Sequence, residues 1–282
     1  MTAWSEGDLQ ANGITIHYYR TDGNNKPPIL LLHGFTDSGL CWPRVAHDLE
    51  GSYDVTMTDA RGHGHSGGSA ADFSLALLAD DAAAVIRALN LEKPYVLGHS
   101  MGAMTAATLA ATYPDLVRAI VLEDPPLRDT SLFQTNVDTS LFQTNEEQQD
   151  QQAWQWLFDL RALRHEERIA RGFVVNPSWA EEEIIPWATS KAEFNIDMME
   201  PALAAFNNAA PWREIISRIE CPILLMTGDP ELHAIVTPEV AQEATQLWKH
   251  GEAVHISGAG HNIHRDRYDE TMAAVRAFLN HT

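Results

Sequence analysis

Gly98-His99-Ser100-Met101-Gly102 follows the short apolar run Tyr95-Val96-Leu97 and precedes an Ala-rich stretch, residues 103–111, of good helix formers. This is a G-x-S-x-G pattern placed between a predicted strand and a predicted helix. Glycine suits positions 98 and 102 because a side chain at either would collide with the backbone of so sharp a turn. The serine hydroxyl would then stand exposed beside a helix N-terminus, whose unpaired N–H groups favour negative charge. The pattern therefore predicts that Ser100 is a nucleophile.

Three further motifs also follow predicted strands. His33-Gly34-Phe35 closes the apolar run 29–32, and Asp59-Ala60-Arg61-Gly62-His63-Gly64-His65-Ser66 follows the run 55–58. Gly258-Ala259-Gly260-His261 follows a third run, 253–256. Together with residues 98–102, these motifs resemble the α/β-hydrolase superfamily, specifically its capped serine esterase/lactonase type. The resemblance covers roughly residues 10–126 and 214–281. It implies an α/β-hydrolase fold with an inserted helical cap, and it is much more specific for the fold than for a substrate.

Strands alternate with helices along most of the chain, which predicts a mostly parallel sheet with helices on both faces. Apolar runs predict strands at 14–18, 29–32, 55–58, 95–97, 119–122, 223–226 and 253–256. Apolar residues at spacings of three and four predict helices over 75–89, over 239–248 and from Tyr268 to Leu279. The crossover rules of such a fold then place Ser100 at the carboxyl edge of the sheet, where ligands bind.

The segment 127–213 breaks this alternation and is predicted to be a helical cap inserted after the strand at 119–122, which leaves 1–126 and 214–282 as the core. It holds five of the eight tryptophans: Trp154, Trp156, Trp179, Trp187 and Trp212. A lid over a site needs an apolar underside, so we expect a few of these rings to line a pocket, while most attach the cap to the core. The heptapeptide of residues 130–136 recurs at 139–145, and two copies are too few for a repeat architecture.

Composition limits the possible partners. The formal net charge of −20 disfavours nucleic acid and anionic membrane surfaces. The acidic clusters at 146–147, 166–167 and 181–183 are expected on solvated faces. A neutral small-molecule substrate fits this charge better than a polyanion, and we expect a monomer or a homodimer.

Location can also be judged from the sequence. The chain has no apolar run of 18 residues and begins without a basic, apolar leader, so we expect neither a membrane span nor a secretion signal. Its two cysteines, Cys41 and Cys221, form no disulfide framework or metal cluster. A cytoplasmic location is therefore expected.

The candidate general base is His261. A serine hydroxyl needs a base within hydrogen-bond reach, and histidine, whose ordinary pKa is close to neutral, commonly serves. Among the 13 histidines, His261 is distinguished by its turn after the last predicted strand. His264, His63, His65 and His99 are weaker candidates. The pair His261-x-x-His264 lacks an evident third ligand, so we expect neither a metal nor a cofactor.

The carboxylate that orients His261 has three candidates. In the superfamily it usually follows the strand that matches 223–226, and Glu231 or Asp229 would then serve. A subset of the superfamily places the acid after the preceding strand instead, which matches Asp124. We favour Asp124. For the oxyanion hole, the nucleophile motif supplies the amide of Met101, and the resemblance implies that the second donor is the amide of Phe35.

A serine at position 100 argues against the haloalkane dehalogenases and epoxide hydrolases of this superfamily, which need an aspartate nucleophile. An acyl-enzyme on Ser100 predicts hydrolysis of an ester, lactone or thioester. One alternative is a hydrolase of carbon–carbon bonds in dienoic ring-cleavage products. Such a substrate is acidic, and the sequence near the nucleophile has no evident arginine pair to bind it. Another is a receptor that keeps the triad but only senses a ligand, because fold alone does not decide function.

Overall fold

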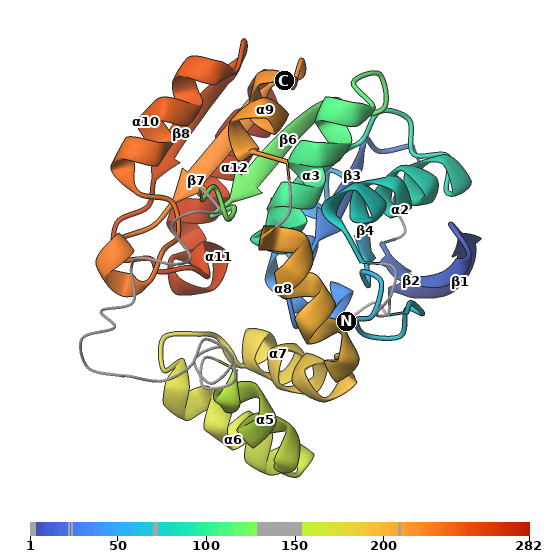
Figure 1. Cartoon of the computed structure of the whole chain (residues 1–282), viewed down its shortest axis with the longest axis vertical. Coiled ribbons are helices and arrows are strands. Elements are labelled where there is room, and N and C mark those ends of the chain that lie inside the picture. The colour runs from blue at the N-terminus through green and yellow to red at the C-terminus, as the bar shows by residue number, and fades with distance from the viewer. Residues whose placement is uncertain (1–3, 22, 24, 70–72, 129–153, 208–209) are drawn as a thin grey trace.

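The computed structural model describes residues 4–21, 23, 25–69, 73–128, 154–207 and 210–282. The eight strands of the described residues form one sheet in the order β1-β2-β4-β3-β5-β6-β7-β8 (Figure 1). The pairs β1·β2 and β2·β4 are antiparallel, and all other neighbours are parallel. The strands are β1 (Ser5–Ala11), β2 (Ile14–Arg20), β3 (Pro28–Leu32), β4 (Asp54–Thr58), β5 (Tyr95–His99), β6 (Ala119–Glu123), β7 (Ile223–Thr227) and β8 (Gly251–His255). The mostly parallel sheet predicted from the sequence is confirmed.

Strand β1 is the one strand that the apolar pattern does not predict. Its sequence, SEGDLQA, is mostly polar, and none of its residues is fully buried. It forms because Asn12 and Gly13 connect it to β2 in a two-residue turn, in which both residues have positive φ (46° and 77°). An Asn-Gly pair with this backbone is the preferred connection of a tight hairpin. The turn, rather than hydrophobic burial, therefore makes β1 an edge strand.

Helices cover both faces of the sheet. One face carries α2 (Leu75–Ala88), α3 (Met101–Thr112), α9 (Trp212–Ser217) and α10 (Pro238–Leu247). The other carries α1 (Pro43–Leu49), α11 (Ile263–Asp266) and α12 (Tyr268–His281). Successive side chains of a strand point to opposite faces, so Leu30 and Leu32 join the first core while Ile29 and Leu31 join the second. Each central strand is buried on both sides, as its continuous apolar run predicts.

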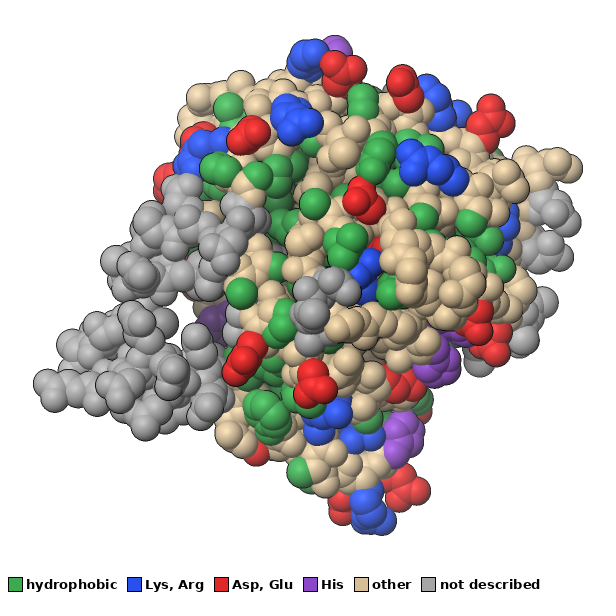
Figure 2. Space-filling view, turned by 45° about the vertical axis from the view of Figure 1, so that its right-hand side comes forward, with side chains coloured by type: hydrophobic (Ala, Val, Ile, Leu, Met, Phe, Trp, Pro, Cys, Tyr) green, Lys and Arg blue, Asp and Glu red, His purple; other side chains and the backbone are tan. Residues whose placement is uncertain are grey.

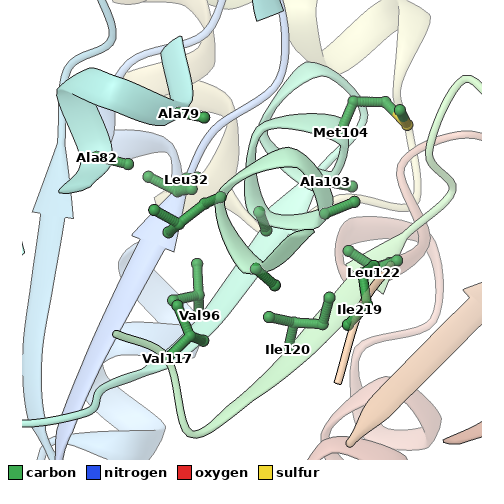
Figure 3. Packing of buried hydrophobic residues seen from close by; sticks show 14 of the residues in the cluster. Leu32, Ala79, Ala82, Val96, Ala103, Met104, Val117, Ile120, Leu122 and Ile219 are labelled. Atoms are coloured by element: carbon green, nitrogen blue, oxygen red, sulfur yellow. The ribbon is translucent and has the colours of Figure 1, made fainter. Parts of the chain in front are cut away.

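Helix α3 lies deepest in the first layer, and nine of its twelve residues are buried. Figure 3 shows Ala103 and Met104 of α3 above strand residues such as Val96, Ile120 and Leu122, with Ala79 and Ala82 of α2 alongside. The many alanines let the helix approach the sheet closely, which fixes the position of its first turn. That turn begins directly after Ser100.

The chain between β6 and β7 contributes the helices α5 (Gln155–Ala162), α6 (His165–Val175), α7 (Glu181–Glu193) and α8 (Met199–Asn207). Figure 1 shows α5, α6 and α7 grouped beyond one edge of the core. The order of the elements thus agrees with an inserted helical cap, and its boundaries at 127 and 213 stay a prediction. Trp179 and Trp187 pack within this group, whereas Trp212 belongs to the core under α3. The duplicated heptapeptide lies outside the described residues.

The surface matches the dispersed charge of the sequence. Figure 2 shows acidic and basic side chains interspersed on the face that it displays. One expectation about the acidic clusters is wrong: Glu181 and Glu182 are exposed, but Glu183 is fully buried. The sequence places all three in the first turn of α7, and the helix directs the third toward the core. No helix among the residues described here is long and apolar enough to cross a membrane.

Candidate active site

Ser100 lies in a strained turn between β5 and α3. Its backbone has φ 52° and ψ −113°, a conformation that residues other than glycine rarely adopt. Two backbone hydrogen bonds hold it there: its N–H donates to Glu123 O at 2.9 Å, and its carbonyl accepts from Met104 N at 3.1 Å. Because strain of this kind persists only where the surroundings enforce it, the turn marks Ser100 as a candidate functional residue.

Two glycines make the turn possible. A Cβ atom on Gly98 would lie 2.2 Å from Gly102 O, and one on Gly102 would lie 2.0 Å from Leu32 O. Both contacts are with backbone atoms, which cannot move aside as a flexible side chain can. As the sequence predicts, a side chain at either position would therefore collide with the backbone.

His261 and Asp124 form a short hydrogen bond. His261 Nδ1 lies 2.6 Å from Asp124 Oδ2, the carboxylate is fully buried, and the imidazole is 28% exposed. The same carboxylate accepts hydrogen bonds from the amides of Ile235 and Val236 at 2.8–3.0 Å. Since an ionised carboxylate can only accept, Nδ1 must carry the proton, and this leaves Nε2 as the basic nitrogen.

The two rival acids lie elsewhere. Glu231 is exposed in the short 3₁₀ helix η5 (Pro230–Leu232). Asp229 bonds His255 Nε2 at 2.8 Å and the amide of Gly258 at 2.7 Å. Asp229 thus stabilises the turn before His261, whereas the structure brings only Asp124, of the three candidates, to the imidazole itself.

The loop after β3 approaches the nucleophile closely. A Cβ on Gly34 would lie 2.6 Å from His99 Nδ1 and 3.5 Å from Ser100 Cβ, so glycine lets this backbone lie against the serine. Phe35 follows directly. Met101, the other expected donor, is the first residue of α3, and such an amide has no partner within its own helix. The structure therefore brings the backbone of Gly34, the neighbour of Phe35, against Ser100, while Met101 follows Ser100 in the chain.

Aromatic side chains surround Phe35. Its ring contacts those of His63, Trp154 and Phe194 edge-on, with centroids 5.0–5.6 Å apart. Trp154 and Phe194 come from the inserted segment, so the insertion covers the loop beside Ser100. Trp156, by contrast, is 42% exposed, and Trp179, Trp187 and Trp212 pack in the clusters described above.

Burial lowers the pKa of three histidines in this region, which favours their neutral forms. Burial and, to a lesser extent, the neighbouring His33 lower the pKa of His63 to about 3. Burial likewise lowers the pKa of His99 to about 3, and it lowers the pKa of His33. His99 Nε2 donates to the carbonyl of His261 at 2.9 Å. His99 thus anchors the backbone of His261, the candidate base, and only the folded contact reveals this role.

The remaining base candidates have other partners. His264 Nδ1 bonds both carboxylate oxygens of the buried Glu123, at 2.8 and 2.9 Å, while the imidazole of His65 lies 3.6 Å from Glu193. The part of the chain that the structure describes has no group of three His, Cys, Asp or Glu that could hold a metal ion.

Comparison with known proteins agrees with this geometry. Residues 27–268 match the model of the α/β-hydrolase fold family, and the chain belongs to that family. It is 28% identical to an N-formylmaleamate deformylase of Pseudomonas putida, over 98% of this chain and 96% of that protein. It is 27% identical to an (E)-2-((N-methylformamido)methylene)succinate hydrolase of Acinetobacter baylyi, over 96% of this chain and 97% of that protein.

A solved structure of an N-formylmaleamic acid deformylase from Pseudomonas putida S16 has the same fold. It superposes with a TM-score of 0.76 at 24% identity, and the match covers 96% of this chain and all of that one. The family and the full-length relatives together place the chain among the hydrolases.

The turn at Ser100 predicts a sharp difference between two glycines. Gly102→Ala should lower the free energy of unfolding by more than about 2 kcal/mol, because the new methyl group meets the Leu32 carbonyl. Gly51→Ala is the control, since nothing lies within 4 Å of a Cβ at that position. Urea unfolding of both variants measures the difference. Equal stabilities would contradict the close backbone approach.

Proposed function

We propose that this chain is a serine hydrolase that cleaves a carboxylic ester or lactone through an acyl-enzyme on Ser100. The observation that carries the proposal is the 2.6 Å bond between His261 Nδ1 and the buried Asp124, together with a serine in a strained turn whose neighbour His99 bonds the His261 carbonyl. A hydroxyl nucleophile, an imidazole and an orienting carboxylate are the three parts that such catalysis requires.

The proposed reaction has two halves. His261 Nε2 takes the proton of the Ser100 hydroxyl as Oγ attacks the carbonyl carbon, and the amides of Phe35 and Met101 stabilise the oxyanion. His261 then gives the proton to the leaving alcohol, and the acyl group stays on Ser100. A water molecule, deprotonated by His261, attacks the acyl carbon and releases the carboxylic acid. Asp124 holds the tautomer in which Nε2 is free to act and stabilises the imidazolium.

The proposed substrate is small to medium in size, apolar and uncharged. The aromatic side chains of Phe35, Trp154 and Phe194 support this, as does the net charge of −20. Chemistry alone does not decide among the candidate functions, because a triad of this kind also cleaves amides, thioesters and, in some members of the superfamily, carbon–carbon bonds.

A second candidate is hydrolysis of an N-acyl bond in a substrate that carries carboxylates. Two relatives that match nearly the whole chain favour it, since one is named for N-formylmaleamate and the other for a formamido-substituted succinate. The same serine, imidazole and oxyanion donors would serve an amide carbonyl. The two candidates differ in the charge of the substrate, which a simple assay resolves.

Removal of the nucleophile tests the proposal directly. Ser100→Ala should abolish hydrolysis of p-nitrophenyl esters and leave the circular dichroism spectrum unchanged, because only a hydroxyl is lost. An organophosphonate should label the wild type at Ser100, as mass spectrometry of its peptides would detect, and leave Ser100→Ala unlabelled. Retention of more than a small fraction of kcat/KM would exclude Ser100, and a labelled protein without turnover on any substrate would favour a receptor.

A matched panel tests the charge of the substrate. Neutral esters and lactones should be hydrolysed with a higher kcat/KM than anionic esters of similar size, since the chain carries a charge of −20. N-formyl amides of maleamate and succinate type belong in the same panel. Faster turnover of these anionic amides would reject the neutral ester in favour of the second candidate.

The three carboxylates predict different phenotypes. Asp124→Asn should lower kcat by about 10⁴, the loss that the equivalent change causes in a serine protease, because the amide favours the wrong imidazole tautomer. Asp229→Asn should lower the melting temperature with a far smaller loss of kcat, and Glu231→Gln should change neither. Kinetics and melting curves of all three variants make the comparison. A large loss of kcat for Glu231→Gln alone would assign the acid to the loop after β7.

A further inference from the structure

We infer that Trp179 and Asp266 are positioning residues through which the inserted helices hold His261 in place. The inference rests on the proposed function, because it assigns these residues a role in the action of His261. Its physical basis is one carboxylate that bonds the insertion with one oxygen and the His261 turn with the other.

The two bonds of Asp266 are short and well separated in sequence. Trp179 Nε1 donates to Asp266 Oδ1 at 2.7 Å, across 87 residues. The amide of Gly260 donates to Asp266 Oδ2 at 2.8 Å, and Gly260 directly precedes His261. A Cβ on Gly260 would lie 2.3 Å from Leu232 O, so this backbone has little room to shift. A displacement of Trp179 would therefore act on the turn that carries the imidazole.

Asp266 belongs to a rigid element. It ends α11, whose His264 bonds the buried Glu123 of β6 through both its ring nitrogen and its amide. Trp42 stacks on the same imidazole with ring centroids 4.4 Å apart. Because α11 is fixed to the sheet in this way, the Asp266 carboxylate has a defined position. The hydrogen bond from Trp179 then fixes its orientation.

A second set of contacts fixes the insertion on the same side of the core. Lys191 of α7 is buried, and its Nζ donates to Asp37 Oδ1 at 2.5 Å and to Thr36 O at 3.1 Å. The amide of Asp37 bonds Gly34 O at 3.1 Å, which closes the turn that contains Phe35. Helix α7 therefore contacts the loop of the proposed oxyanion donor, while Trp179, two residues before α7, bonds Asp266 of α11, which accepts the Gly260 amide from the loop of the proposed base.

Arg265 connects the two sets of contacts. Its Nη2 donates to Asp37 Oδ2 at 2.8 Å, and its guanidinium lies 4.9 Å from the centre of the Trp179 ring. Glu183 of α7 lies 3.7 Å from Arg265 Nε. Two basic and two acidic side chains are thus buried together between the insertion and the core. Such groups contribute less stability than apolar residues of the same size would, but they define a single relative position.

Removal of the indole N–H of Trp179 tests whether this residue positions His261 or only attaches the insertion to the core. Trp179→Phe keeps an aromatic ring against Arg265 but removes the bond to Asp266 and part of the packing surface of the indole. We expect kcat for a small p-nitrophenyl ester to fall about tenfold, within the range found for residues that couple distant sites. KM should change less than about twofold, because the insertion would still cover the site. The rate of phosphonate labelling at Ser100 should fall in parallel with kcat.

The chain offers a matched control. Trp187 is also buried in the insertion and packs edge-on against Trp179, with ring centroids 6.0 Å apart. Its indole makes no hydrogen bond to the core among the residues that the structure describes, so Trp187→Phe should lose packing without losing kcat. Similar melting temperatures for the two variants would show that any difference in kcat does not come from stability.

Asp266→Asn completes the test. Asn keeps one acceptor oxygen and so can serve either Trp179 or Gly260, but not both. If the two residues act through one link, the double variant should be about as slow as the slower single variant. Multiplied losses, or a kcat of Trp179→Phe within twofold of Trp187→Phe, would overturn the inference. Should Trp179→Phe fail to fold, Asp266→Asn alone must show the loss of kcat at unchanged KM. A wild type that is neither labelled at Ser100 nor active would overturn the proposed function itself.

Discussion

The contact between the backbones of β3 and α3 is the constraint on which the site depends. Leu32 O approaches Gly102 so closely that no side chain fits, and Gly98 meets the carbonyl of Gly102 in the same way. These contacts enforce the positive φ of Ser100 and direct the start of α3 toward the serine. They also bring the loop after β3, with Gly34 and Phe35, beside the nucleophile. One dense packing contact therefore positions both the serine and its proposed oxyanion donors.

The sequence predicts the elements whose burial dominates their formation. Strands β3 to β7 have apolar runs because both of their faces are covered, so the runs locate them to within two residues. Strand β1 and helix α1 lack such a signal: β1 depends on the Asn12-Gly13 turn, and α1 is a short helix that starts at Pro43. Local chemistry decides these elements, and periodicity alone does not detect them.

The candidate site is predicted only in part for a different reason. Ser100 and His261 lie in glycine-rich turns that are visible in the sequence, but the partner of His261 depends on which of two strand ends lies nearer in space. Asp124 and His261 are 137 residues apart, and no spacing rule relates them. The same holds for His99, whose bond to the His261 carbonyl spans 162 residues. For Glu183 the prediction is wrong in the other direction. The acidic run 181–183 indicates an exposed surface, but the helix directs Glu183 into the interior.

The position of Asp124 also explains how a large insertion can start so close to the site. The residue follows β6 directly, and Pro125, Pro126 and the buried core residue Leu127 come next in the chain. Its amide bonds Met226 O of β7, and its carboxylate accepts the amides of Ile235 and Val236, beyond that strand. Segments before and after the insertion therefore bond each other at the carboxylate itself. Because these bonds are independent of the inserted helices, the insertion can differ in sequence and length without displacing Asp124, and its influence on His261 must pass through contacts such as that of Trp179 with Asp266.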